Sequence, residues 1–111
     1  MLPSAWVYIL TNSPRHTTLY VGSSIDLPTR LWEHRTKQNP KSFTARYNVS
    51  KPVYYEPFEQ IEDALKRESF IKGKTRKWKE DLINKSNPEW SDLTEEITRK
   101  CLNTQSKAPP P

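Results

Sequence analysis

A chain of 111 residues with a formal net charge of +5 has room for one domain with a modest core. Apolar residues make up only 33% of it, but four Trp, five Tyr and three Phe argue against disorder. Its single cysteine, Cys101, excludes an internal disulfide and a cysteine-based metal site, and it fits a reducing compartment. The first residues resemble neither a signal peptide nor a membrane span, so we expect a cytoplasmic protein.

The N-terminal residues predict a β-hairpin. Residues 5–10 are strong strand formers, and a turn signal at Asn12-Ser13-Pro14 separates them from a second strand at residues 17–22. A short connection between two strands implies an antiparallel pair. If Tyr8 pairs near Tyr20, both hydroxyls emerge together, although the loop length does not fix the register.

A helix is expected next, from an N-cap at Asp26 to about Lys37. Arg30 and His34 are four residues apart and therefore project from one face of it. Asn39-Pro40 ends the helix.

The rest of the chain predicts one strand and three helices. Residues 42–50 read as irregular, and proline at both ends of residues 52–58 restricts this third strand to a sheet edge or a short run. A helix over 59–74 follows, with shorter helices at 77–85 and 90–100. The period of the 59–74 helix marks a buried face made of Ile61, Ala64, Leu65 and Ile71. We expect the domain to span residues 1–100 and residues 101–111, polar and Pro-rich, to be a disordered tail.

Glu68 is the most unusual residue of this pattern. It lies three residues after Leu65 and three before Ile71, in a position that the helical period reserves for an apolar side chain. A buried carboxylate needs a partner or must be neutral. Two interpretations stay open: Glu68 forms an ion pair within the domain, or it binds a divalent cation at the edge of a cleft.

The other candidate residues are suited to phosphate chemistry. Arg30 can donate two hydrogen bonds to a phosphate, and His34 can exchange a proton near neutral pH. Each also has an ordinary explanation, because Arg30 could pair with Glu33 or Asp26 and His34 could be a helix-surface residue. Tyr8 and Tyr20 could be common strand tyrosines, since a phenol needs a nearby base or cation to activate water.

Taken in order, these residues resemble the motif series of the GIY-YIG nuclease superfamily over about residues 4–98. The closest branch is that of small single-domain bacterial proteins resembling the nuclease domains of excision-repair and intron-encoded endonucleases. The matching elements are Trp6-Val7-Tyr8, Tyr20-Val21-Gly22, Arg30, His34 and Glu68. The sequence departs from the pattern at Trp6, where the first motif has glycine, and at Ser23, where the repair branch has lysine.

The resemblance implies an α+β fold, a three-stranded antiparallel sheet flanked by helices in the order β-β-α-β-α-α. It implies that Glu68 holds one Mg²⁺ or Mn²⁺. Gly22 matches the motif glycine, where a side chain would obstruct the approaching backbone. Asn87 has no secure match to the late catalytic-site asparagine of the homing branch.

The resemblance also implies roles for four side chains. Tyr8 and Tyr20 match the two motif tyrosines, one of which acts as general base on water, and which one differs between branches. Arg30 matches the arginine that stabilises charge on the phosphate, and His34 matches a histidine that passes a proton in some branches.

The resulting hypothesis is a metal-dependent endonuclease that hydrolyses phosphodiester bonds, with DNA preferred to RNA. Basic residues would hold the strand by its phosphates and read no sequence. Those we expect to do so are Arg46, Lys51, Lys66, Lys72, Lys74, Arg76 and Lys77. No reader module is visible, so specificity would need a protein partner or dimerisation. The alternative is a non-catalytic DNA- or RNA-binding module that acts with a partner protein. No membrane partner is expected, and the oligomeric state is open.

Overall fold

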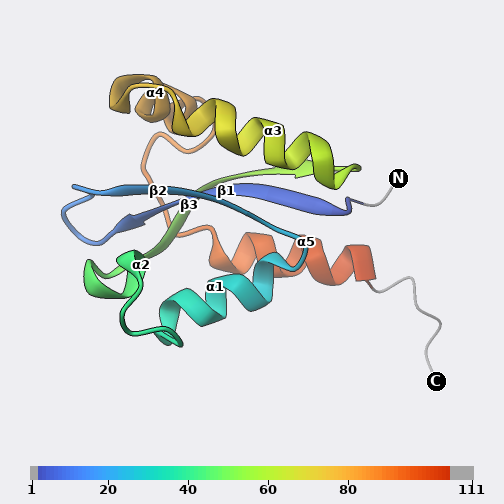
Figure 1. The fold of residues 1–111 in the computed structure, drawn as a ribbon, viewed down its shortest axis with the longest axis horizontal. Helices are drawn as coiled ribbons and strands as arrows, with labels where there is room; N and C mark the ends of the chain where they lie inside the picture. Colours follow the sequence, from blue (N-terminus) through green and yellow to red (C-terminus); the bar gives the residue numbers. More distant parts are fainter. Residues whose placement is uncertain (1–2, 106–111) are drawn as a thin grey trace.

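The computed structural model describes residues 3–105, with side chains to residue 101. Within these residues one antiparallel sheet has the strand order β2-β1-β3, formed by β1 (Ala5–Asn12), β2 (Leu19–Ser24) and β3 (Val49–Phe58). Helices lie on both sides of the sheet (Figure 1). One layer contains α3 (Ile61–Lys72) and α4 (Arg76–Ser86), and the other contains α1 (Leu27–Arg35), α2 (Phe43–Arg46) and α5 (Thr94–Gln105). The predicted α+β class with a three-stranded antiparallel sheet is confirmed.

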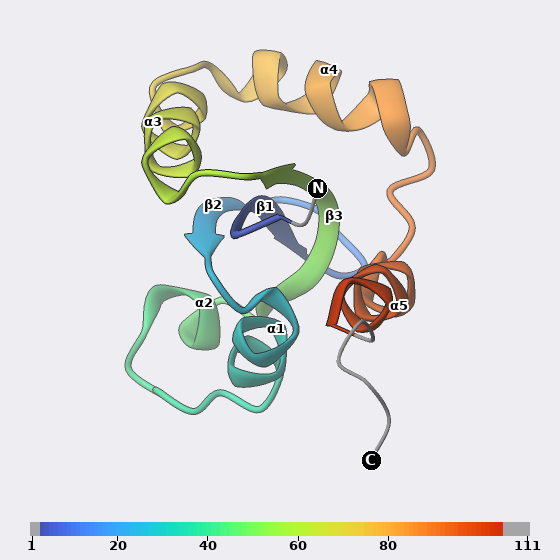
Figure 2. The same cartoon turned by 90° about the vertical axis from the view of Figure 1, so that its right-hand side faces the viewer.

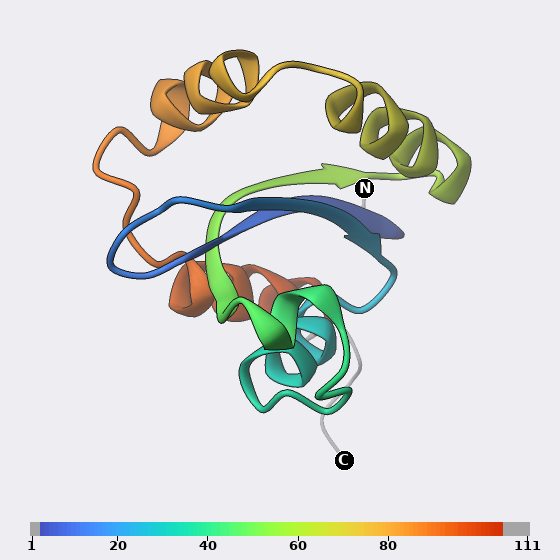
Figure 3. The same cartoon turned by 60° about the vertical axis from the view of Figure 1, so that its left-hand side comes forward.

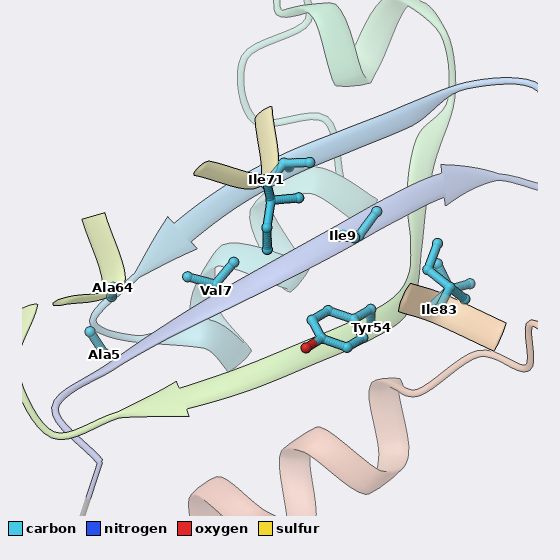
Figure 4. Packing of buried hydrophobic residues seen from close by; sticks show 9 residues of the cluster. Ala5, Val7, Ile9, Tyr54, Ala64, Ile71 and Ile83 are labelled. Carbon is cyan, nitrogen blue, oxygen red and sulfur yellow. The ribbon is translucent and has the colours of Figure 1, made fainter. Parts of the chain in front are cut away.

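The central strand β1 supplies both halves of the core. Its residues are buried from Ala5 to Thr11, which explains their nearly continuous apolar character. Alternate side chains enter two clusters on opposite faces of the sheet. The cluster under α3 and α4 (Figure 4) contains Ala5, Val7, Ile9, Val21, Val53, Tyr54, Ala64, Ile71 and Ile83. The cluster facing α1 and α5 contains Trp6, Tyr8, Leu10, Leu27, Leu31, Val49, Ile97 and Cys101.

The structure fixes the register of the hairpin, which the sequence left open. Tyr8 pairs with Gly22, and Tyr20 pairs with Leu10. Tyr8 therefore pairs two residues away from Tyr20. Because side chains repeat every two residues along a strand, the two tyrosines still share a face. The edge position of β3 is confirmed, since in this sheet β3 is hydrogen-bonded to β1 alone.

The buried face of α3 is narrower than the sequence pattern predicts. Ala64 and Ile71 are buried as expected, but Ile61 and Leu65 are 45% and 51% exposed. Figure 2 shows α3 above the β2 side of the sheet, with α4 continuing across the top. A sheet of three strands is too narrow to cover a wider stripe of a helix that lies over its edge.

One helical segment was not expected. Residues 42–50 are not wholly irregular, because α2 begins after Ser42, whose side chain caps the backbone N–H of Ala45. The final helix, which was expected over residues 90–100, is α5, and it begins at Thr94 and runs to Gln105. The domain therefore continues past residue 100, and Cys101 is buried in the core. The remaining residues of the predicted tail, 106–111, lie outside the described part. The element order is thus β-β-α-α-β-α-α-α. Compared with the order that the resemblance implies, it has α2 and α5 in addition, of which α5 was already expected from residues 90–100.

Candidate active site

The Tyr8 ring lies against Gly22 of the edge strand β2, where no side chain occupies the space. A Cβ atom at Gly22 would lie 2.6 Å from both Cζ and Oη of Tyr8, and 3.1 Å from Cε2 of Tyr20. The backbone of Gly22 does not have a positive φ angle, so the requirement here is for space. The expectation that a side chain would obstruct this position is supported, but the obstructed group is the phenol of Tyr8 and not an approaching backbone.

His34, on α1, is held by hydrogen bonds at both ring nitrogens. Its Nε2 lies 3.2 Å from the hydroxyl of Tyr8, and its Nδ1 lies 2.9 Å from the hydroxyl of Thr44 on α2. Thr44 is 4% exposed. Sequence reasoning missed Thr44 because it read this segment as irregular, although Ser42 is a recognisable helix N-cap.

The protonation states of this pair follow from burial. Burial raises the pKa of the Tyr8 phenol well above its ordinary value, and the neighbouring Tyr20 raises it further, so Tyr8 stays protonated at neutral pH. Desolvation, together with the charge of Arg30, lowers the pKa of His34 below 6.5, so the imidazole is neutral. When the Tyr8 hydroxyl donates to Nε2, the proton on Nδ1 is free to donate to Thr44.

A pocket of about 420 Å³ opens beside these side chains, where α1, α2 and β2 meet (α1 and α2 lie side by side in Figure 3). Its lining contains Tyr20, Arg30 and His34, but neither Tyr8 nor Glu68. The other lining residues are Glu33, Lys37, Gln38, Asn39, Ser42, Phe43 and Thr44. The pocket therefore combines a phenol, a guanidinium and an imidazole.

Arg30 also makes the contact that its ordinary explanation predicts. Its Nη1 lies 3.6 Å from a carboxylate oxygen of Glu33, and both side chains are 40–50% exposed. Such a pair contributes only about 0.5 kcal/mol or less. The guanidinium can therefore turn toward a phosphate in the pocket at little cost.

Glu68 is ion-paired within the domain. Its Oε2 lies 2.7 Å from Nζ of Lys72, four residues later on α3, and its Oε1 accepts a hydrogen bond of 2.5 Å from the Ser23 hydroxyl. Burial raises the pKa of this carboxyl, but the hydrogen bonds from Lys72 and Ser23 outweigh that effect and lower it. The carboxylate is thus ionised at neutral pH, and its side chain is 16% exposed.

The edge strand separates Glu68 from the pocket. Along β2, Tyr20 and Gly22 face α1, whereas Val21 belongs to the core under α3 and Ser23 bonds Glu68. Arg30 links the two sides, because it also lines a smaller depression of about 240 Å³ that contains Ser23 and reaches Ala64 on α3. The predicted residues therefore gather around β2, but from two layers and not in one cavity.

Comparison with known proteins decides the family. Residues 4–81 match the model of the GIY-YIG catalytic domain. The chain belongs to the GIY-YIG family. It is 37% identical over 84 residues to a UPF0213 protein of Syntrophus aciditrophicus, covering 76% of this chain and 93% of that protein. A UPF0213 protein of Streptococcus agalactiae is 37% identical over 75 residues, covering 68% and 82% of the two chains.

A solved structure supports the fold. The solution NMR structure of a UPF0213 protein from Bacillus halodurans matches with a TM-score of 0.51 and 23% identity, covering 82% of this chain and 94% of that chain. GIY-YIG domains are typically nucleases, whereas the name UPF0213 states no reaction. No helix within residues 3–105 combines the length and apolar character needed to cross a membrane.

GIY-YIG nucleases generally use divalent metal ions, which this chain would have to bind through its own side chains. Among the described residues no group of three or more His, Cys, Asp or Glu side chains could enclose one. Mg²⁺, however, often keeps several waters and takes only one or two carboxylates plus phosphate oxygens. Glu68, with the Ser23 hydroxyl beside it, fits that open kind of site. Lys72 is 52% exposed, and an exposed i,i+4 pair contributes only about 0.3–0.5 kcal/mol, so a divalent cation can replace its ammonium group.

Several of the predicted phosphate-binding residues in this GIY-YIG domain already have partners. Arg76 donates to the backbone oxygens of His16 and Thr17 at 2.6 and 2.7 Å and contacts Glu80 at 2.8 Å. Its side chain therefore ties α4 to the hairpin loop. Lys66 is exposed on α3 and remains a candidate for phosphate contact.

The remaining basic residues also divide into some that contact other residues of the domain and one that is exposed. Nζ of Lys51 lies 3.0 Å from Nε2 of His16, and Lys77 lies 3.5 Å from Asp81. Lys74 lies over the Phe70 ring at 4.4 Å. Arg46 is exposed, on the outer side of α2. Lys51, Lys74 and Lys77 thus have contacts within the domain, whereas Arg46 and Lys66 are exposed.

Asn87 has a structural role in this chain. Its side-chain amide donates to the backbone oxygens of Val53 and Ser91, and its Oδ1 accepts from the Ser91 N–H at 3.0 Å. Asn87 is 8% exposed and holds the connection after α4 against β3. These bonds account for its polar groups without a catalytic role.

Proposed function

We propose that this protein is a metal-dependent endonuclease that hydrolyses phosphodiester bonds of nucleic acid, with DNA preferred to RNA and little intrinsic sequence specificity. The observation that carries the proposal is the pocket in which Tyr20, Arg30 and His34 meet, in a chain of the GIY-YIG family. A phosphate needs positive charge beside it, and an attacking water needs a proton acceptor. The pocket supplies both.

Tyr20 is assigned to the attacking water. It lines the pocket, whereas Tyr8 is 1% exposed and held in its protonated form. Tyr8 instead fixes the imidazole ring through its bond to His34. The ring of His34 lies edge-on to Tyr20, with 5.6 Å between the centroids. In the other tautomer of neutral His34, Nε2–H donates to Tyr8 and Nδ1 accepts from the Thr44 hydroxyl. Thr44 lines the pocket, so its hydroxyl can pass its own proton to Nδ1 while it takes up the proton released there.

Arg30 is assigned to the phosphate. Its half-exposed guanidinium can form two parallel hydrogen bonds to phosphate oxygens and stabilise the charge that develops in the transition state. Glu68 is assigned to the metal, with the Ser23 hydroxyl holding one carboxylate oxygen in place. When bound, a divalent cation polarises a phosphate oxygen and stabilises the leaving oxygen.

The experiment is cleavage of supercoiled plasmid and branched DNA with Mg²⁺, with Mn²⁺ and with a chelator. We expect product only with metal, and none from Glu68→Ala. Arg30→Ala and Tyr20→Phe should each lower the rate about 100-fold or more, as for a lost transition-state donor. Glu62→Ala is the control, because Glu62 is an exposed acid in the first turn of the same helix. Equal cleavage by Glu68→Ala and Glu62→Ala would remove the metal-ligand assignment.

The ion pair between Glu68 and Lys72 favours a second candidate function, a nucleic-acid-binding module without turnover that acts with a partner protein. Such a module would shift labelled DNA or RNA in a salt-dependent way and give no product with any divalent metal. Its Glu68→Ala variant would bind as tightly as the wild type or more tightly, because a negative charge is lost near phosphates. The same cleavage experiment therefore separates the two functions. A specificity-giving partner remains part of both proposals, and the buried thiol of Cys101 fits a cytoplasmic setting.

A further inference from the structure

A row of aromatic rings leads out of the pocket. Tyr20 and Phe43 are stacked, with ring centroids 6.5 Å apart and planes inclined by 26°. Tyr47 continues the row, at 4.9 Å from Phe43. We call these three residues the aromatic row. Phe43 and Tyr47 are 50% and 52% exposed, so the row presents ring surface to solvent.

The fold does not need this exposed surface. The short helix α2 is anchored by Thr44 and Ala45, which are buried, and Thr44 also bonds His34. Phe43 and Tyr47 belong to neither core cluster. Buried Thr44 thus holds the histidine, while Phe43 in α2 and Tyr47 at its C-cap present their rings to solvent. Exposed large apolar side chains grouped beside a pocket indicate a binding surface.

Cations accompany the aromatic row. Arg30 and Lys37 line the same pocket as Phe43. The guanidinium of Arg46 lies 6.0 Å from the centre of the Tyr47 ring. Aromatic rings next to positive charge are the means by which proteins hold single strands, since bases stack on the rings while the cations hold the phosphates. Bases inside a duplex are stacked on one another and offer no free face.

We infer that the aromatic row stacks unpaired bases next to the phosphate held by Arg30, and that the substrate is single-stranded nucleic acid or the unpaired part of a branched one. The inference rests on the proposed function, because it takes Arg30 as the residue that holds the phosphate in the pocket. It adds the strand state of the substrate, which the motif residues alone do not specify.

The test is binding without turnover, measured by fluorescence anisotropy in a chelator at fixed salt. The probes are a labelled single-stranded DNA 12-mer of mixed sequence and the same strand in a duplex. Phe43→Ala should raise the single-strand Kd about 5- to 150-fold, and Phe43→Trp should restore binding. Trp32→Ala is the matched control, because Trp32 is 57% exposed on α1 and does not line the pocket. Trp32→Ala should change the Kd by less than about twofold.

Two results would overturn the inference. One is a single-strand Kd for Phe43→Ala and Tyr47→Ala that equals that of Trp32→Ala, with each variant folded by circular dichroism. The other is an equal loss for single strand and duplex, which would make the row a general contact. Ring-dependent single-strand binding without product in any metal would end the proposed nuclease function and leave this inference standing. Cleavage of intact duplex at an equal rate by wild type and Phe43→Ala would support the proposed nuclease function and overturn this inference.

Discussion

The absence of a Cβ atom at Gly22 leaves the space in which the Tyr8 phenol lies. The hydroxyl of Tyr8 occupies the space that a side chain at Gly22 would fill, and Tyr8 is 1% exposed and cannot move aside into solvent. Gly22→Ala should therefore displace the phenol, break its bond to His34 and lower the free energy of unfolding by about 1–3 kcal/mol. Urea denaturation measures this change.

Gly73→Ala is the control for that prediction. A Cβ atom there would come no closer than 3.6 Å, to the backbone oxygen of Phe70, and the backbone at Gly73 is in the right-handed helical region. Its effect on stability should be neutral or slightly favourable. Equal stability of the two variants would contradict the role given to Gly22.

The lowered pKa of His34 makes a prediction about pH. Burial and the charge of Arg30 keep the imidazole neutral in the folded protein, so activity that needs neutral His34 should fall on the acid side with a midpoint below pH 6.5. The unfolded chain binds the proton more readily, so the stability that His34 contributes is present above pH 6.5 and is lost as pH falls through its lowered pKa. Single-turnover cleavage and urea denaturation across pH 4.5–8, in wild type and His34→Gln, are the measurements.

His34→Gln should lower the rate about 100-fold or more and remove the acid limb. Its stability should approach that of the wild type as the pH falls below 6.5. An acid limb with its midpoint above pH 6.5, or one that survives the substitution, would rule out the neutral imidazole as proton acceptor.

At the scale of elements, the basic residues expected to bind phosphate separate into those that stabilise the fold and those that are exposed and can contact nucleic acid. Arg76 joins α4 to the β1–β2 loop through two backbone oxygens. Arg76→Ala should lower the free energy of unfolding by about 1–2 kcal/mol. Lys66→Ala, on the exposed face of α3, should change it by less than about 0.5 kcal/mol.

DNA-binding measurements also distinguish Lys66 from Arg76. Lys66→Ala should weaken DNA binding and reduce the slope of log K against log salt concentration by about one. Chemical denaturation and a salt titration of binding provide the two readouts. A Lys66 variant that leaves the slope unchanged, or an Arg76 variant with wild-type stability, would reverse the assignments.

The elements also show where the sequence pattern was sufficient. The strand β1, the N-cap Asp26 and the edge strand β3 depend on local features, and each formed near its predicted position. The strand β3 begins at Val49, three residues before Pro52, so its prolines lie within the strand. The exposure of Leu65 depends on where α3 lies over the sheet, which no local period records. The role of Thr44 depends on α2 meeting α1, a contact between segments that the pattern does not connect.

At the scale of the whole molecule, the fold class and family could be predicted, but the arrangement of the site only in part. The motif order fixed which residues surround β2, because the hairpin and the first helix are close in sequence. It could not show that Glu68 reaches β2 from the other helical layer, nor that Ser23 and Lys72 hold its carboxylate. Those contacts depend on the packing of α3, 45 residues further along the chain from Ser23.

The central claim is that a divalent cation binds Glu68 beside the pocket that holds the phosphate. Its most direct test is a crystal of the protein with an uncleavable single-stranded oligonucleotide, soaked in Mn²⁺ and measured for anomalous scattering. The account predicts one peak about 2.0–2.2 Å from a Glu68 carboxylate oxygen, with Lys72 displaced and a phosphate between the cation and Arg30. A strand bound in the pocket with Lys72 still paired to Glu68, and no peak at that carboxylate, would contradict it.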